Sequence, residues 1–202
     1  MKKYPAIALI EFGSIAAGVT AGDAMIKKAP ISLFKSGTVS RGKYLVLIGG
    51  SVASVEESFT EGLVVGKEFL VDKVLLPDVH PEVIAAILGN RTTVTKEAFG
   101  LLETASVAAT IQAADAGIKG AEVLIVEIRL ADALGGKAFV MFNGKVEDVE
   151  AAIEIGMSTI KNEALWRNKT VIPALHRELA KEIDGTTRFS AAEFRKIPGE
   201  EE

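Results

Sequence analysis

The chain of 202 residues contains no cysteine, and this absence removes several kinds of chemistry. Without thiols there can be no disulfide bond, no thiolate metal site and no cysteine nucleophile. Histidine is also scarce, because only His80 and His176 are present and neither stands in an HxH or HExxH pattern. Metal-binding residues are therefore too few to indicate a metal site, and we expect none.

The sequence also lacks long hydrophobic runs and a strong net charge. No run of about eighteen apolar residues occurs, so we expect no membrane span and no membrane partner. In the N-terminal stretch MKKYPAIALIEF, Glu11 ends the apolar run before it is long enough for a signal peptide. The net charge of −4, with both signs mixed, argues against a nucleic-acid partner, which requires a basic face. Together these absences indicate a cytoplasmic protein.

What the sequence does contain is a long internal repeat. Residues 11–29, EFGSIAAGVTAGDAMIKKA, recur at residues 103–121 as ETASVAATIQAADAGIKGA, with ten of nineteen positions identical. Further matches follow at shifts of 94 and 96 residues, up to a Pro-x-x-His motif that ends at His80 and His176. A repeat of roughly 90 residues is a duplicated domain rather than a solenoid unit.

Apolar and turn-forming segments follow the same order in both copies and predict a βαββαβ domain with a short helix after it. Ser14 and Ser106 are the expected N-caps of the first helix in each copy. We therefore predict an α+β fold of two tandem ferredoxin-like-derived βαββαβ domains, at residues 1–92 and 97–184. Residues 185–202 are polar and are expected to form a loosely held C-terminal tail.

The apolar content is higher than two such domains need. Counting glycine and leaving out tyrosine, it is about 57%, against an ordinary 45–50%. A four-stranded sheet with two helices on one face also leaves its other face to a second subunit or to water. We therefore expect an obligate oligomer.

Two pairs of repeated features could carry chemistry. Glu11 and Glu103 end apolar strands, and paired acids can perform acid–base catalysis. Neither has a nucleophile or a second acid nearby in the sequence, so we expect a lysine or backbone partner and no catalytic residue. The glycine-rich stretches at residues 49–51 and 135–137 lack the P-loop and GxGxxG patterns, and tight turns are the favoured interpretation.

The order of these motifs resembles the bacterial microcompartment shell domain. The resemblance rests on a strand ending in Glu, a helix of the form A-A-D-A-x-x-K-x-A, a G-K strand start, a V-x-x-V-E helix and a P-x-x-H strand end. It covers about residues 6–180 in both copies. Two such domains in one chain resemble the tandem, trimer-forming shell proteins, above all those of propanediol-utilisation compartments, in TVSRGK (38–43) and LGGK (134–137).

The resemblance implies a structural shell protein rather than an enzyme. The protein would form a pseudohexameric homotrimer with itself. Other microcompartment shell proteins would be its partners, and encapsulated enzymes would be a further class of partner. Lys27 and Lys119, late on the first helix of each copy, would lie at the assembly edge of the tile. A central pore for small metabolites would be lined by Ser40, Arg41, Gly42, Leu134 and Gly135.

The chain departs from the family pattern in two places. The propanediol-utilisation relatives have a cysteine where Ser40 stands here, and three copies of it hold an iron–sulfur cluster. Since a hydroxyl cannot replace a thiolate, we expect no cofactor. Asp78 and Ala174 stand where the family has the arginine of P-R-P-H, so the edge contact is expected to be weaker or differently made.

Two other functions stay open at this point. A ferredoxin-like regulatory module that binds a small effector at subunit interfaces would also fit the fold. An enzyme on the same fold is less favoured, because the sequence shows no catalytic constellation.

Overall fold

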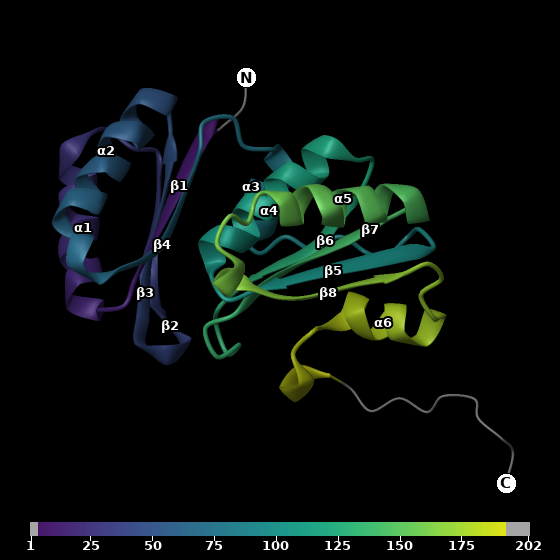
Figure 1. Ribbon diagram of the computed structural model, residues 1–202. Coiled ribbons are helices and arrows are strands. Elements are labelled where there is room, and N and C mark those ends of the chain that lie inside the picture. Colours follow the sequence, from purple (N-terminus) through teal and green to yellow (C-terminus); the bar gives the residue numbers. More distant parts are fainter. Residues whose placement is uncertain (1–3, 193–202) are drawn as a thin grey trace, which may run out of the picture.

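The computed structural model describes residues 4–192, so most of the predicted tail, residues 193–202, lies outside the described residues. Figure 1 shows two domains side by side, each with a pair of helices on one face of its sheet. The sheets are antiparallel, with strand orders β2-β3-β1-β4 and β6-β7-β5-β8. The predicted α+β architecture is therefore confirmed. No helix in this part of the chain is long and apolar enough to span a bilayer.

The two domains have the same order of elements. The first contains β1 (Ala6–Phe12), α1 (Ile15–Lys28), β2 (Leu33–Val39), β3 (Lys43–Gly50), α2 (Val52–Val65) and β4 (Leu70–Leu76), followed by α3 (Pro81–Ile87). The second contains β5 (Ala98–Thr104), α4 (Val107–Gly120), β6 (Leu124–Leu130), β7 (Ala138–Gly144), α5 (Val146–Ser158) and β8 (Trp166–Ile172), followed by α6 (Arg177–Gly185). Short 3-10 helices lie at Ser40–Gly42, Lys67–Phe69, Glu163–Leu165 and Phe189–Ala191.

The first helix of each domain begins where the sequence predicts. The Ser14 hydroxyl accepts a hydrogen bond from the backbone N–H of Ala17, and the Ser106 hydroxyl accepts one from that of Ala109. These bonds satisfy N–H groups that the first turn of a helix leaves without an intrahelical partner. The small residues of these helices allow close packing, since a Cβ at Gly117 would lie 2.9 Å from the carbonyl oxygen of Ala152 on α5.

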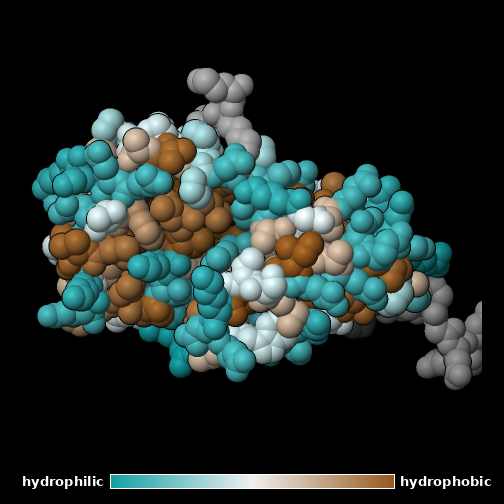
Figure 2. Space-filling model, turned by 45° about the horizontal axis from the view of Figure 1, so that its top comes forward, coloured by the Kyte–Doolittle hydropathy of each residue, from teal (hydrophilic) through white to brown (hydrophobic). Residues whose placement is uncertain are grey.

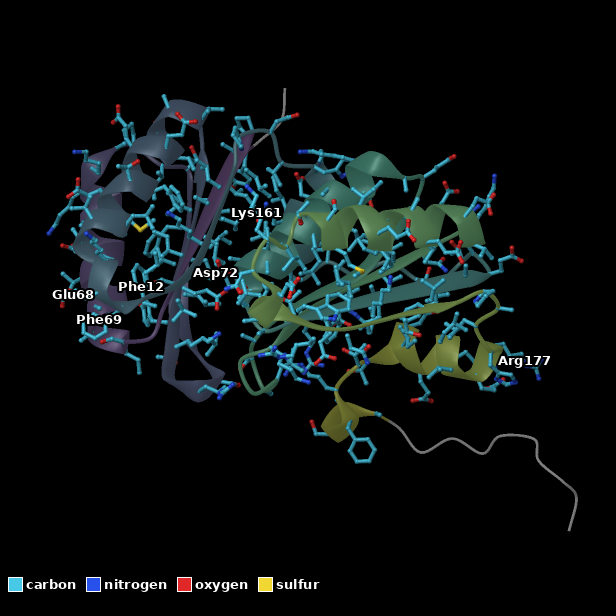
Figure 3. The ribbon with its side chains drawn as sticks, in the orientation of Figure 1. Phe12, Glu68, Phe69, Asp72, Lys161 and Arg177 are labelled. Atoms are coloured by element: carbon cyan, nitrogen blue, oxygen red, sulfur yellow. The ribbon has the colours of Figure 1, made fainter. Side chains whose placement is uncertain are left out.

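Strands β1, β3 and β4 of the first sheet contribute to two different cores. Along β1, Ala6, Ala8, Ile10 and Phe12 pack between the sheet and the pair α1 and α2, where Figure 3 shows Phe12. The alternate residues Ile7 and Leu9 face the other way and share a core with the second domain. Because side chains alternate across a strand, one sheet can bury both faces.

The domains are joined by helices packed across the boundary. Helix α4 lies against β4 and β1 of the first domain, and α3 crosses to pack against β6 of the second. Val79, Val83 and Ile87, on and before α3, are buried in the core that contains the α4 side chains. The two domains therefore share one continuous hydrophobic core.

Helix α6 takes a different position from its counterpart α3. Figure 1 shows it on the face of the second sheet opposite α4 and α5. Ile183 packs there against Phe99, Val126 and Met141. The Arg91 guanidinium donates to the carbonyl oxygens of residues 183–185, which fastens the end of the helix.

The start of the predicted tail is also held to this sheet. The Thr187 hydroxyl donates to the Glu127 carboxylate over 2.8 Å, and the Arg129 guanidinium donates to the Thr187 carbonyl oxygen over 3.1 Å. The expectation of a loosely held tail is therefore wrong for these first residues. The cause is the polar pair on β6, which gives the tail specific partners.

Candidate functional site

The interface between the two domains is organised around a buried ion pair. The Lys43 ammonium lies 3.2 Å from the Glu11 carboxylate, whose side chain is fully buried. The other carboxylate oxygen of Glu11 accepts a hydrogen bond of 2.8 Å from the backbone N–H of Ala108, in the first turn of α4. Lys43 also donates to the carbonyl oxygens of Ala105 and Gly136. The lysine or backbone partner predicted for Glu11 is confirmed, since both are present.

This arrangement changes the acidity of Glu11. Burial raises the pKa of its carboxyl group above the usual value, because the low-polarity surroundings disfavour the charged form. The Lys43 charge and the Ala108 N–H act in the opposite direction, while the nearby charge of Asp72 adds to the increase in pKa. The positive end of the α4 dipole also faces the carboxylate. The pair is thus a polar joint between the domains.

Further polar contacts join the first domain to both ends of α4. At its start, the Ser106 hydroxyl donates to Asp72, which Figure 3 shows between the two domains. Nearer its end, Asp115 accepts a 2.7 Å hydrogen bond from the backbone N–H of His80. Lys119 binds both Asp115 and the carbonyl oxygen of Asp78. The first domain therefore contacts polar groups along the whole length of α4.

The corresponding surface of α1 has no such neighbour among residues 4–192. Ile15, Val19 and Ile26 are 45%, 52% and 47% exposed, whereas their counterparts on α4 are at most 8% exposed. Figure 2 shows hydrophobic residues gathered over the first domain. Most of the large exposed hydrophobic residues of the described chain belong to it: Ile15, Val19, Ile26, Phe34, Val52, Val64, Val65, Phe69, Val71 and Leu88, against Leu179 and Phe189 in the second.

The loops predicted to line a pore lie together at one end of the domain interface. The first is the turn Ser40–Gly42, in which Arg41 has φ 68° and Gly42 has φ 67°. The second, between β6 and β7, also contains left-handed residues, among them Gly135. A Cβ at Gly136 would lie 2.9 Å from Cδ of Arg41. Two segments far apart in the sequence thus form one surface, where Arg41 and Gly135 are exposed and Leu134 is half-buried.

The remaining predicted residues lie elsewhere. Lys27 pairs with Asp23 at 2.6 Å and is largely exposed, whereas Lys119 lies at the domain interface. His80 and His176 cap helices, because the Nδ1 atom of each accepts a backbone N–H over 3.3 Å. Within residues 4–192 no group of three side chains suited to a metal ion is found. Gly49 and Gly50 continue β3 rather than forming a separate turn.

Asn143 is a structural residue that the sequence reasoning missed. Its amide oxygen accepts from the backbone N–H groups of Thr95 and Lys96, and its amide nitrogen donates to the carbonyl oxygens of Lys96 and Ala98. It thereby fixes the linker that leads into the second domain. The available signal was a lone amide in the apolar strand AFVMFNG, where a buried polar group requires partners.

Comparison with known proteins gives matches over most of the chain. The family described as "BMC domain" matches residues 6–79 and 98–175. The bacterial microcompartment shell protein PduT of Citrobacter freundii is 36% identical over 178 residues, covering 88% of this chain and 97% of that protein. The shell protein PduA of Salmonella typhimurium is 34% identical over 86 residues, which is 43% of this chain and 89% of that protein.

Solved structures agree with these relatives. The crystal structure of a microcompartments protein from Desulfitobacterium hafniense DCB matches with a TM-score of 0.77 and 39% identity, over 87% of this chain and 98% of the other. A fused permuted hexameric shell protein of the RMM microcompartment matches with a TM-score of 0.57 and 20% identity, over 79% and 86% of the two chains. The second match supports the fold alone.

Proposed function

Because the chain belongs to the BMC domain family, it is a structural component of a bacterial microcompartment shell, and we propose that it works there as a pseudohexameric homotrimer. In this proposal the trimer tiles with other shell proteins and passes small metabolites through a central pore. Its relatives are structural shell proteins. We further propose that the chain has no catalytic activity of its own. Enzymes enclosed by the shell would be among its partners.

The single observation that carries the trimer proposal is the difference between α1 and α4. Helix α4 buries its apolar face and its polar ends against the first domain of its own chain. Helix α1 has closely related residues in the same positions, but its face with Ile15, Val19 and Ile26 is exposed. A second domain from another chain would cover it in the same way. Such a head-to-tail contact forms a closed ring if the rotation closes, and three chains would give six domains.

The pore proposal rests on the two loops that meet beside this interface. Around a threefold axis, three Ser40 hydroxyls would form a polar, uncharged constriction able to donate to or accept from a passing hydroxyl or carbonyl group. Three Arg41 guanidinium groups would add a positive collar that attracts anions and is screened by salt. Gly42, Leu134 and Gly135 would complete the wall. The residues present do not suit an iron–sulfur cluster, since the chain offers hydroxyls and no thiolates.

Lys27 and Lys119 are proposed as residues of the tile edge. Lys27 is exposed on the free side of α1, and Lys119 retains a partly exposed side chain while its ammonium binds the first domain. A lysine can lay its stem along a neighbour while its charged end binds a carbonyl oxygen. Sheets seen by electron microscopy that disappear in the K27D variant, with trimers retained, would support the edge position of Lys27; sheets that persist would contradict it.

The trimer is tested by sedimentation of the purified protein at micromolar concentration, together with electron microscopy. We expect a species of three chains that assembles into sheets or tubes. A monomer would contradict the proposal. Discrete particles whose melting temperature rises with a small effector would instead favour a regulatory module, a function that the relatives named above do not support.

The pore is tested by placing a cysteine at the proposed axis of this cysteine-free protein. In S40C three thiols would converge, so a three-armed maleimide should join all three chains in one band on a denaturing gel. The matched control is T60C, an exposed position on α2 away from the loops, which should give only single labelling. An S40C trimer that stays intact but is not joined would show that Ser40 does not face its symmetry mates.

A further inference from the structure

We propose that Glu103 and Lys137 form the joint that closes the trimer. In this joint the Glu103 carboxylate accepts a hydrogen bond from the backbone N–H of Ala16 of the partner subunit, in the first turn of its α1. The Lys137 ammonium donates to backbone carbonyl oxygens beside that turn. The inference rests on the proposed trimer and names the residues that hold it together.

The first argument is that the same joint is already formed once within the chain. There Glu11 accepts from the N–H of Ala108 in the first turn of α4, and Lys43 binds Glu11 and the carbonyl oxygens of Ala105 and Gly136. The start of a helix attracts an anion because its N–H groups lack intrahelical partners and its dipole is positive there. This copy therefore shows which groups a completed joint contains.

The second argument is that half of the other joint is already assembled. Glu103 follows Glu11 at a shift of 92 residues and Lys137 follows Lys43 at 94. The two side chains form an ion pair, yet they are 25% and 48% exposed, whereas Glu11 and Lys43 are 0% and 14% exposed. Glu103 and Lys137 thus pair with each other as Glu11 and Lys43 do. They are more exposed, however, whereas α4 covers the Glu11–Lys43 pair.

The matching half is the exposed start of α1. By the same shifts, Ala16 corresponds to Ala108, Gly13 to Ala105, and Gly42 to Gly136. Ser14 caps this helix as Ser106 caps α4, so the local backbone has the same form at both places. The exposed residues Ile15 and Val19 lie beside it, where Val107 and Ile111 are buried in the formed interface. Polar and apolar parts of the surface are therefore in register.

The third argument is the one charge that differs between the two joints. In the sheet, Asp72 lies opposite Glu11 and Asn168 lies opposite Glu103. Each side-chain Oδ1 accepts the backbone N–H of the following residue, at 2.8 Å and 2.9 Å, so both have the same orientation. Asp72 uses its second oxygen to accept from Ser106. At the equivalent place Asn168 would donate its amide N–H to Ser14 of the partner subunit.

This difference suits an interface that forms between separate chains. The charge of Asp72 raises the pKa of Glu11, which means that two carboxylates lie close enough to repel each other. Asparagine at position 168 removes that repulsion from Glu103. Fewer charges then lose their water when two chains meet, which lowers the cost of burying the joint.

The test is the trimer dissociation constant, measured by sedimentation for E103A, K137A and wild type. Removing one member of a buried, hydrogen-bonded pair should raise that constant by at least about tenfold. The matched controls are E178A and K181A, which remove an ion pair on α6, outside the joint, and should leave the trimer dissociation constant unchanged. The thermal unfolding of the dissociated chain should change little in all four variants, which separates assembly from folding.

A fifth variant, N168D, restores the second carboxylate and should weaken the trimer at neutral pH, with recovery as the pH is lowered. It changes an exposed residue, so the chain itself should fold. If wild type forms trimers and the E103A and K137A chains form them as tightly, the proposed Glu103–Lys137 joint is wrong. The trimer proposal would still stand. If N168D also binds as tightly, the account of Asn168 is wrong. A wild-type monomer would overturn the proposed function itself.

Discussion

The two domains have related sequences and the same fold, but their first helices have opposite surroundings. Val107, Ile111 and Ile118 on α4 are nearly or fully buried, while Ile15 and Val19 at equivalent positions on α1 are about half exposed. The apolar pattern of a helix therefore shows that one of its faces is covered, but not which molecule covers it. Here one copy is covered within the chain, and the proposed trimer would cover the other.

The largest effects are expected when a charge is placed on the apolar face of each helix in turn. I111D puts a carboxylate into the shared core without a partner and should cost about 3–5 kcal/mol of unfolding free energy. V19D changes an exposed position and should alter the stability of the isolated chain by less than about 0.5 kcal/mol. It should nevertheless abolish the trimer. Urea denaturation and sedimentation of both variants provide the check. If I111D and V19D lowered the unfolding free energy equally, the proposed difference between α4 and α1 would be wrong.

A second contrast lies in Asn143, which corresponds to Gly49 in the first domain. N143A removes the amide that binds backbone groups of the linker and should cost about 2 kcal/mol, because those groups lose their partner. Amide hydrogen exchange should show faster exchange at Thr95 and Lys96. N143D is the control, since it keeps the acceptor but loses the donor and should retain protection at these two residues.

The two helix caps offer a smaller contrast. S14A should cost about 1 kcal/mol in the isolated chain, the usual effect of losing an N-cap. S106A should cost more, about 2 kcal/mol, because Asp72 also loses a hydrogen-bond donor at a buried interface. The difference should disappear in the trimer, where Ser14 gains an equivalent partner. Thermal unfolding of both variants below and above the trimer dissociation constant would measure it.

The smallest expected effect is a dependence on pH that comes from Glu11. Its pKa is raised in the folded chain, so as the pH falls the folded state takes up the proton before the unfolded state does. The contribution of this group to stability should therefore increase as the pH is lowered from neutral toward 4.5, the usual glutamate value. E11Q lacks this titration. A wild-type stability that falls relative to E11Q over the same range would contradict the direction.

Much of the fold could be predicted from the sequence because its signals are local. Ser14 and Ser106 stand where helices start, and the repeat gives the same element order twice. The partner type of Glu11 was also foreseeable, since a carboxylate in a buried strand needs a compensating group. These features depend on residues near one another in the sequence or on simple chemistry.

The arrangement of the copies could not be predicted in the same way. The segments ending in His80 and His176 look alike, yet α3 crosses to the other domain and α6 turns under its own sheet. Partners such as Arg91, 92 residues before Ile183, decide this difference. Likewise, nothing in the repeat distinguishes the buried α4 from the exposed α1, because the difference lies in what surrounds each helix.

The continuous core between the two domains has a consequence for how a ring of six domains could assemble. Half of the contacts form within one chain, at a rate that does not depend on protein concentration. The population of complete rings would then rise with the third power of free protein concentration, where six separate domains would require the sixth power. A tandem chain of this kind could complete its rings at concentrations too low for single domains with equally weak contacts.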